Sequence, residues 1–231
     1  MPDAAIPTNW GCAEDVPPAE RVADAAALLV VDMQNDFVRV GAPLEVPDAR
    51  ITIAPIRRLI GAFRAAGRPV VYTRFYARDT PELMWLWSKQ CQAETRCCWQ
   101  GVRRSYADAD SELECGNVID ELSPLPGDII VDKFGYGSFH ATDLDAKLRA
   151  LGVRSLLVTG TVTQICVEET AREAFHHGYR TTLISDGVSS FAPDLQAATL
   201  RNFAMKFGWV ADAATALSWL GAKQLSHTEV I

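Results

Sequence analysis

The stretch Ala27-Leu28-Leu29-Val30-Val31-Asp32 consists of five apolar residues followed at once by a carboxylate. A short, uninterrupted apolar run is typical of a strand that is buried on both faces, as the strands of parallel sheets are. Further strands are predicted in similar or less uniform stretches at residues 70–73, 128–132, 155–159, 181–185 and 209–210.

Helical patterns lie between these strands. Ile56, Leu59, Ile60 and Phe63 recur at the spacing of one helical face, and Gly67 follows as a stop signal. Further helices are predicted at residues 143–152, 166–177, 194–207 and 213–220. Strands that alternate with helices predict βαβ units, and therefore a parallel sheet of six strands with helices on both faces.

Composition is that of an ordinary globular protein. The 231 residues are 48% hydrophobic and 22% charged, which suits one domain better than two. We expect this domain over residues 25–231, after an irregular, proline-containing arm over residues 1–24. The formal net charge of −7 argues against nucleic acid or an anionic membrane as a partner, because both require clustered Lys and Arg.

The cysteines are interpreted through the compartment in which the chain is expected to work. The sequence has no apolar run of about 18 residues and no basic, apolar leader, so we expect a cytoplasmic protein. In that compartment the six cysteines are expected to be thiols, and none of them forms a CxxC pair of the zinc-finger type. The adjacent Cys97 and Cys98 are interpreted as free thiols.

Three predicted strands end in residues with reactive side chains. Asp32 ends the first strand, Lys133 follows the third, and Cys166 lies after the fourth, where a helix is expected to begin. The carboxyl ends of parallel strands form one edge of the sheet, where ligands bind. A thiol at a helix N-terminus is an activated nucleophile, a carboxylate can take its proton, and an ammonium can hold both anions in place.

These stretches also resemble the isochorismatase-like cysteine hydrolase superfamily. The resemblance rests on Val30 to Phe37, on Asp132-Lys133 with Ser138-Phe139 and Thr142-Asp143-Leu144, and on Gly160-x-x-Thr163-x-x-Cys166-Val167. It runs from about residue 25 to residue 220. It implies a Rossmann-like arrangement of the six strands.

The resemblance also implies the roles of several residues. Asp32, Lys133 and Cys166 would form a catalytic triad, with a cis peptide between Thr161 and Val162. The backbone N–H groups of Val162 and Cys166 would form an oxyanion hole. Because Cys166 is present, the resemblance favours the amidohydrolase branch, with a thioester intermediate, over isochorismatases that cleave vinyl ethers without a cysteine. A homo-oligomer, dimeric or tetrameric, is also expected.

Features around the second strand suggest a substrate. Leu86-Trp87-Ser88-Lys89 is similar to N-carbamoylsarcosine amidohydrolases, and Tyr136 is similar to ureidoacrylate amidohydrolases. Phe37 is a pocket candidate by family position, and Tyr136 and Trp87 are further candidates for binding substrate. Trp85 and Trp87 are expected either to line the pocket or to fill a subunit interface. Arg74 and Arg78 are candidates for pairing with a substrate carboxylate. We therefore expect a small ureido, N-carbamoyl or amide substrate.

Three alternatives remain open from the sequence. A nicotinamidase-like ring-amide hydrolase is disfavoured because the chain lacks the Asp-x-His metal motif after the second strand, and its four histidines are not spaced as a ligand set. An isochorismatase is disfavoured by Cys166. An inactive family member that serves as a binding subunit is disfavoured by the intact triad. Neither a metal nor another cofactor is expected.

Overall fold

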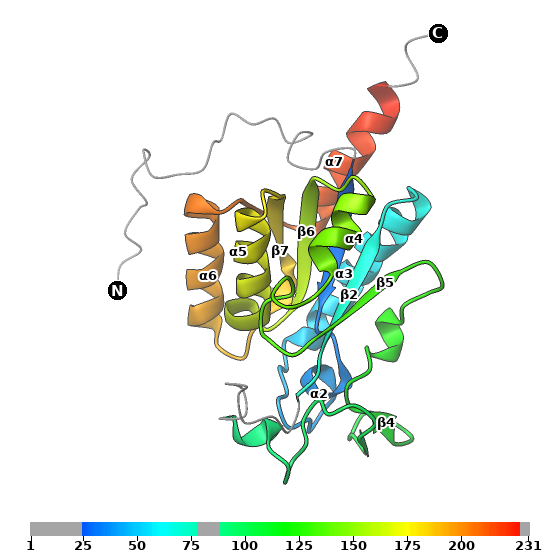
Figure 1. The fold of residues 1–231 in the computed structure, drawn as a ribbon, viewed down its shortest axis with the longest axis vertical. Helices are drawn as coiled ribbons and strands as arrows, with labels where there is room; N and C mark the ends of the chain where they lie inside the picture. Colours follow the sequence, from blue (N-terminus) through cyan, green and yellow to red (C-terminus); the bar gives the residue numbers. More distant parts are fainter. Residues whose placement is uncertain (1–24, 78–87, 227–231) are drawn as a thin grey trace.

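The predicted parallel sheet is present and has six strands. The computed structural model describes residues 25–77 and 88–226, so the predicted arm at 1–24 lies outside the described residues. All neighbouring strands of the sheet are parallel, in the order β5-β2-β1-β6-β7-β8 (Figure 1). The strands are β1 (Ala26–Val31), β2 (Val70–Phe75), β5 (Ile129–Lys133), β6 (Ser155–Thr161), β7 (Arg180–Ser189) and β8 (Trp209–Ala211).

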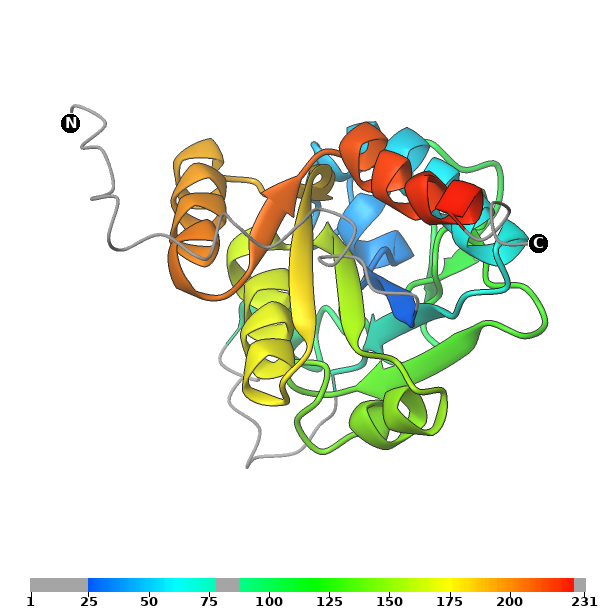
Figure 2. The same ribbon diagram turned by 90° about the horizontal axis from the view of Figure 1, so that it is seen from above.

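Helices cover both faces of this sheet, as predicted. The α-helices are α2 (Asn35–Val38), α3 (Ala49–Ala65), α4 (Leu144–Ala150), α5 (Glu168–His176), α6 (Pro193–Lys206) and α7 (Ala213–Ser226). Seen from above, α3 and α7 lie on one side of the sheet, and α4, α5 and α6 lie on the other (Figure 2). Among the described residues, no helix combines the length and the apolar character that a membrane span needs.

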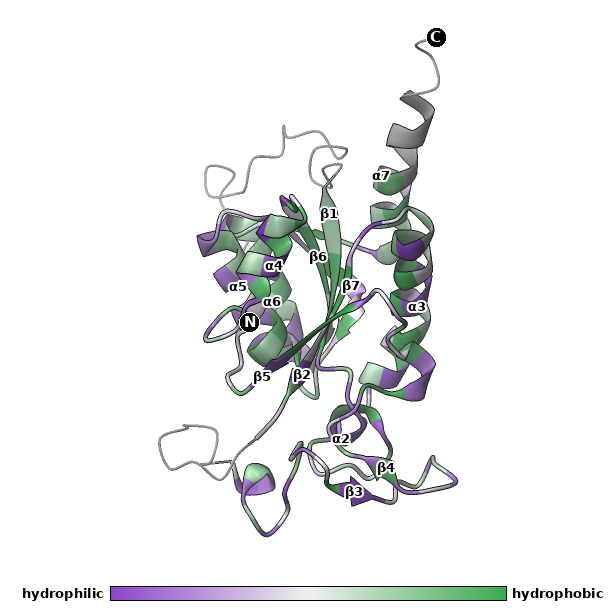
Figure 3. Ribbon diagram, turned by 45° about the vertical axis from the view of Figure 1, so that its right-hand side comes forward, coloured by the Kyte–Doolittle hydropathy of each residue, from purple (hydrophilic) through white to green (hydrophobic). Residues whose placement is uncertain are grey.

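Strand β1 lies between two hydrophobic cores. Ala26, Leu28 and Val30 pack into the core under α3, whereas Ala27, Leu29 and Val31 belong to the core under α4 and α5. All six side chains are fully buried. This alternation is the two-residue period of a strand, and it explains why β1 has no polar position. The apolar strands between two layers of helices are visible in Figure 3.

The strand order reverses between β1 and β6. From β1 the chain continues outward to β2 and β5, whereas β6, β7 and β8 extend to the other side. In open α/β sheets, ligands bind at such a reversal, beyond the carboxyl ends of the strands. The fold therefore places the candidate site at the carboxyl ends of β1 and β6.

The part of the chain between β2 and β5 contributes only short elements where it is described. These are the 3₁₀ turns η3 (Lys89–Cys91) and η4 (Asp120–Leu122) and the two-residue strands β3 (Arg103–Arg104) and β4 (Leu113–Glu114), which pair antiparallel. Figure 3 shows β3 and β4 beyond the carboxyl ends of the central strands, next to α2. This segment lacks the long apolar periodicity of the core, which is why the sequence did not define its elements.

Gly160 allows β6 to lie close to β1 near the site. Its φ of +109° is in a region that other residues rarely adopt, and a Cβ atom there would lie 2.0 Å from the backbone oxygen of Val31. Gly67 also has a positive φ, of +63°, but a Cβ atom at Gly67 would meet nothing within 4 Å. Substitution of Gly67 therefore tests the effect of backbone conformation alone, whereas substitution of Gly160 also tests the close approach of β6 to β1.

We predict that Gly160→Ala destabilises the protein far more than Gly67→Ala. Gly67→Ala should cost about 1–2 kcal/mol, because only the left-handed conformation opposes it. Gly160→Ala should cost roughly 2–5 kcal/mol, because overpacking against β1 adds about 1–3 kcal/mol. Urea unfolding of both variants measures the difference. Equal losses of unfolding free energy would mean that the approach of β6 to β1 is not a constraint.

Candidate active site

The structure brings Asp32 and Lys133 together at the carboxyl edge of the sheet. Asp32 directly follows β1, and Lys133 is the last residue of β5, two strands away. Lys133 Nζ lies 2.8 Å from Asp32 Oδ2, and neither side chain is exposed. Buried charges require a close partner of opposite charge, because leaving water is costly for each ion. The two charged residues are therefore a matched pair inside the protein.

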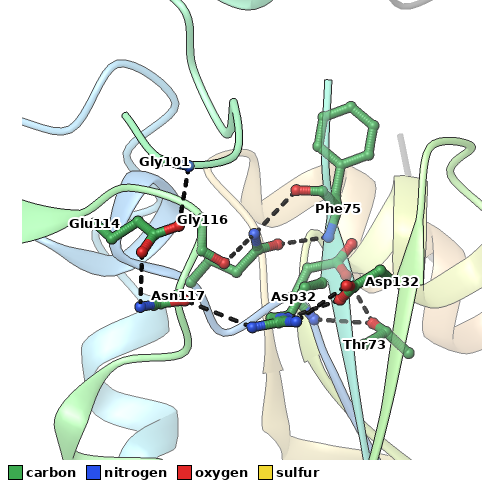
Figure 4. A network of polar contacts seen from close by, with 10 residues as sticks. Asp32, Thr73, Phe75, Gly101, Glu114, Gly116, Asn117 and Asp132 are labelled. Atoms are coloured by element: carbon green, nitrogen blue, oxygen red, sulfur yellow. Dashed lines mark hydrogen bonds and ion pairs between the residues drawn. The ribbon is translucent and has the colours of Figure 1, made fainter. Parts of the chain in front are cut away.

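Thr73 fixes the Asp32 carboxylate from the neighbouring strand. Thr73 Oγ1 donates to Asp32 Oδ1 at 2.6 Å, and Asp32 N–H donates to Thr73 Oγ1 at 3.2 Å. Asp32 itself has a φ of +49°, which is uncommon for a residue with a side chain. Figure 4 shows Thr73 beside Asp32 with these contacts drawn. Thr73 was not among the predicted site residues, although it is a polar residue inside an apolar strand.

Lys133 is held by three acceptors. Besides Asp32, its Nζ donates to the backbone oxygens of Gly135 at 3.0 Å and Tyr136 at 2.8 Å. Burial acts to lower the pKa of Lys133, but the charge of Asp32 and the sulfur of Cys166 outweigh it and raise the pKa. Lys133 is therefore a fixed cation at neutral pH rather than a group that exchanges its proton.

Cys166 joins Asp32 and Lys133 from the end of a third strand, β6. It lies in a π-helical turn, Thr163–Val167, between β6 and α5, so the predicted start of the regular helix at Cys166 is two residues too early. Its side chain is buried, and the charges of both Asp32 and Lys133 act on the pKa of its thiol. The peptide bond between Thr161 and Val162 is cis, at the position that the resemblance implied.

Burial decides the protonation of Cys166. Burial raises the pKa of the thiol to about 12; Lys133 opposes this shift, and Asp32 adds to it. The sequence suggested a thiol activated by a helix N-terminus, which would lower the pKa. In the structure burial opposes that activation, and a carboxylate that can accept the thiol proton lies close by.

A cavity of about 330 Å³ opens onto Cys166. Its walls are mainly apolar, and Phe37 and Tyr136, both predicted as pocket residues, contribute to them. The other lining residues are Pro43, Leu44, Glu45, Val46, Phe75, Ser88, Gln90, Cys91, Val162, Ile165 and Phe191. The Glu45 carboxylate already accepts from Gly41 N–H at 2.9 Å and pairs with Arg50 at 2.8 Å. The described walls thus favour an uncharged part of a small molecule.

The pairing of Arg74 with a substrate carboxylate stays a prediction, and the structure places this side chain away from the cavity. Arg74 does not line the cavity at Cys166. Its Nε and Nη2 donate to the two oxygens of Asp132, at 2.7 and 3.0 Å. Arg74 and Asp132 are register partners on β2 and β5, so their side chains meet on the same face of the sheet. The predicted Arg78, Trp85 and Trp87 lie outside the described residues.

Gln34 joins the ends of two strands to the segment that follows β2. Its side-chain amide donates to the backbone oxygens of Phe75 at 2.9 Å and Gly116 at 2.8 Å, and its oxygen accepts from Phe75 N–H at 2.7 Å. Figure 4 shows Phe75 and Gly116 in this network, next to Asp32. Because Phe75 is a wall of the cavity, Gln34 helps to fix the pocket as well as the strand ends.

Known proteins with the same architecture identify the family. The family model described as the Isochorismatase domain matches residues 26–215. A ureidoacrylate amidohydrolase from Agrobacterium fabrum is 36% identical over 199 residues, 80% of this chain and 85% of that protein. A crystal structure of a cysteine hydrolase from Pseudomonas syringae pv. phaseolicola has a TM-score of 0.76 at 30% identity, covering 90% of this chain and 95% of that one. For N-carbamoylsarcosine amidase from Thermoplasma acidophilum the TM-score is 0.66 at 30% identity, over 81% of this chain and 96% of that one. The chain belongs to the isochorismatase family.

Proposed function

We propose that this protein hydrolyses a C–N bond next to a carbonyl group, with Cys166 as the nucleophile. The observation that carries the proposal is the junction of a buried thiol with the Asp32–Lys133 ion pair, at the end of a cavity of small-molecule size. The names of the relatives support the bond type, since they specify an amidohydrolase and an amidase. The predicted enzyme class, an amidohydrolase, is confirmed at this general level.

Asp32 would move the proton in both halves of the reaction. It takes the proton of the Cys166 thiol as the sulfur attacks the carbonyl carbon, and it gives that proton to the nitrogen as the C–N bond breaks. The amine or ammonia leaves, and an acyl or carbamoyl thioester remains on the sulfur. Asp32 then takes a proton from water, whose oxygen attacks the thioester, and the proton returns to the sulfur as the acid is released.

Lys133 would act by charge and position in this scheme. Its donors are occupied by Asp32 and by two backbone oxygens, so it is not suited to deliver a proton. It offsets the negative charge that passes between Asp32 and the sulfur of Cys166. The backbone N–H groups of Val162 and Cys166 are proposed as donors to the oxyanion that forms on the substrate.

The substrate class follows from the relatives and from the cavity. Two of the relatives are named for ureidoacrylate and N-carbamoylsarcosine, which supports a ureido, N-carbamoyl or simple amide substrate. The apolar walls favour a substrate whose remainder is uncharged where it meets Phe37, Phe75 and Tyr136. A ring amide of the nicotinamide type is the second candidate, because stacked Phe75 and Tyr136, with ring centroids 6.3 Å apart, would also accept a planar ring.

We predict that Cys166→Ala abolishes turnover and leaves the fold intact, because it removes the nucleophile and little volume. The loss in kcat should be about 10³-fold or more. Ammonia or amine release over a panel of ureido acids, N-carbamoyl compounds, alkyl amides and nicotinamide measures activity, and circular dichroism checks the fold. A folded variant that retains more than about one-tenth of wild-type activity would exclude Cys166 as the nucleophile.

We predict that Lys133→Met slows alkylation of Cys166 by iodoacetamide. Lys133 is the group that lowers the pKa of this thiol against the effect of burial, so its loss should raise the pKa further and leave less thiolate at any given pH. The measurement is the alkylation rate between pH 6 and 10, followed on the Cys166 peptide by mass spectrometry. An unchanged pH dependence in the folded variant would refute the electrostatic role of Lys133.

We predict that Tyr136→Ala raises KM about tenfold for the preferred substrate, which corresponds to ~1.4 kcal/mol of lost contact. The ring lines the cavity, whereas the contact to Lys133 comes from the Tyr136 backbone and survives. Arg74→Ala is the control, because its guanidinium pairs with Asp132 outside the cavity. A rise in KM for acidic substrates alone in Arg74→Ala would restore the role that the sequence suggested for this arginine.

A further inference from the structure

A second group of buried thiols lies behind the wall of the cavity, and the proposed reaction does not use it. Cys97 and Cys98 are fully buried, and their sulfurs are 3.7 Å apart. Their sulfurs and a carboxylate oxygen of Asp36 all lie within 4.8 Å of one another. Cys91 lines the cavity, and the neighbouring thiol of Cys97 raises the pKa of the Cys91 thiol.

The backbone brings the two adjacent thiols to the same side. Neighbouring side chains of an extended segment point to opposite sides, so adjacent cysteines do not normally converge. Here Arg96 and Cys98, on either side of Cys97, both have a φ of +53°, in the left-handed region that side chains disfavour. This backbone conformation costs free energy. Two thiols that serve only as small apolar core residues could point in any direction, so core packing alone does not account for the conformation.

We propose that Asp36, Cys97 and Cys98 form a structural site for Zn²⁺ or a similar thiophilic divalent cation. Sulfur ligands of a tetrahedral zinc ion, at about 2.3 Å from the metal, lie about 3.8 Å apart, close to the 3.7 Å between Cys97 and Cys98. Two thiolates and one carboxylate would supply three of the four ligands of a tetrahedral ion, and a water molecule would complete the set.

The surroundings of Asp36 resemble the outer shell of such a site. Asp36 Oδ1 accepts from Tyr106 Oη at 2.7 Å and pairs with Arg104 Nε at 3.0 Å, and Oδ2 accepts from Cys98 N–H at 2.8 Å. A carboxylate has about four acceptor positions, so one position on Oδ2 is left for a cation. Arg104 would offset part of the negative charge of the ligand set. Outer contacts of this kind orient metal ligands.

A cation here would stabilise the least regular part of the fold. Asp36 belongs to α2, which follows shortly after β1 and Asp32, whereas the cysteines belong to the segment after β2. A shared ion would join this segment to the core next to Cys91, which interacts with Cys97 and forms part of one wall of the cavity. The ion would have a role in stability and pocket shape, and none in the proposed chemistry at Cys166.

The test is metal loading of the full-length chain. Protein reduced, stripped with chelator and titrated with Zn²⁺ should bind about one ion per chain tightly. Its Tm should rise by several degrees, because an ion that binds only the folded state stabilises it. With Co²⁺ in place of Zn²⁺, a thiolate-to-metal charge-transfer band in the near ultraviolet should appear. Cys166→Ser is the matched control, since it removes a buried thiol outside the group and should keep both signals.

Cluster variants locate the ion. Cys97→Ser and Cys98→Ser should each lose the cobalt band or weaken binding at least tenfold while Cys166→Ser does not. If neither variant folds, the Cys166→Ser protein alone decides the question. Absence of a charge-transfer band and of any rise in Tm in that protein would overturn the proposal. A cobalt band that disappears only with Cys166→Ser would also overturn it. So would a disulfide between Cys97 and Cys98 in protein purified under air, if that protein still binds no metal after the disulfide has been reduced.

Discussion

The buried ion pair between Asp32 and Lys133 is the interaction on which the rest of the site depends. Both side chains are inaccessible to water, and their nitrogen and oxygen atoms are 2.8 Å apart. Removing one partner of such a pair leaves an uncompensated charge in the interior and typically costs about 3–5 kcal/mol. The intact pair adds little to stability, because the desolvation of both ions offsets their attraction. Its role is to hold a carboxylate beside the Cys166 thiol, which is the arrangement that proton transfer from sulfur requires.

The parallel sheet brings these side chains together, because its strands end at one edge. Asp32 and Cys166 follow the two central strands at the point where the strand order reverses, and Lys133 reaches them from the edge strand. Thr73, on the strand between them, orients the carboxylate, and Gly160 allows the backbones of β6 and β1 to approach closely. The reactive groups thus come from rigid elements, which can hold them in place better than loops can.

The sequence predicted the parts of this architecture that depend on local pattern. Apolar runs located the strands, and the residues at their ends located Asp32, Lys133 and Cys166, because parallel strands bring their carboxyl ends to one edge. The role of Arg74 could not be judged in the same way. Whether its guanidinium is available depends on the register that places Asp132 beside it on the next strand, and register is a property of the folded sheet.

The interpretation of Cys97 and Cys98 as free thiols had a similar limit. Their spacing matches no common metal motif, and their convergence with Asp36 depends on two left-handed residues and on contacts across more than 60 positions of the chain. Burial likewise reversed the expected direction of the pKa shift at Cys166, because the residue lies within a π-helical turn of the interior. Local sequence patterns carry little information about such desolvation.

The proposed reaction passes through a thioester on Cys166, and trapping with hydroxylamine distinguishes this route from direct attack by water. During turnover of the best substrate in increasing hydroxylamine, release of the amine or ammonia should continue at an unchanged rate. The product should shift from the acid to the hydroxamate or hydroxyurea, because the nucleophile competes with water for one common intermediate. Cys166→Ala and Asp32→Asn should form neither product. If wild-type enzyme releases nitrogen at full rate and yields only the acid at every hydroxylamine concentration, water attacks the substrate directly and the thioester account is contradicted.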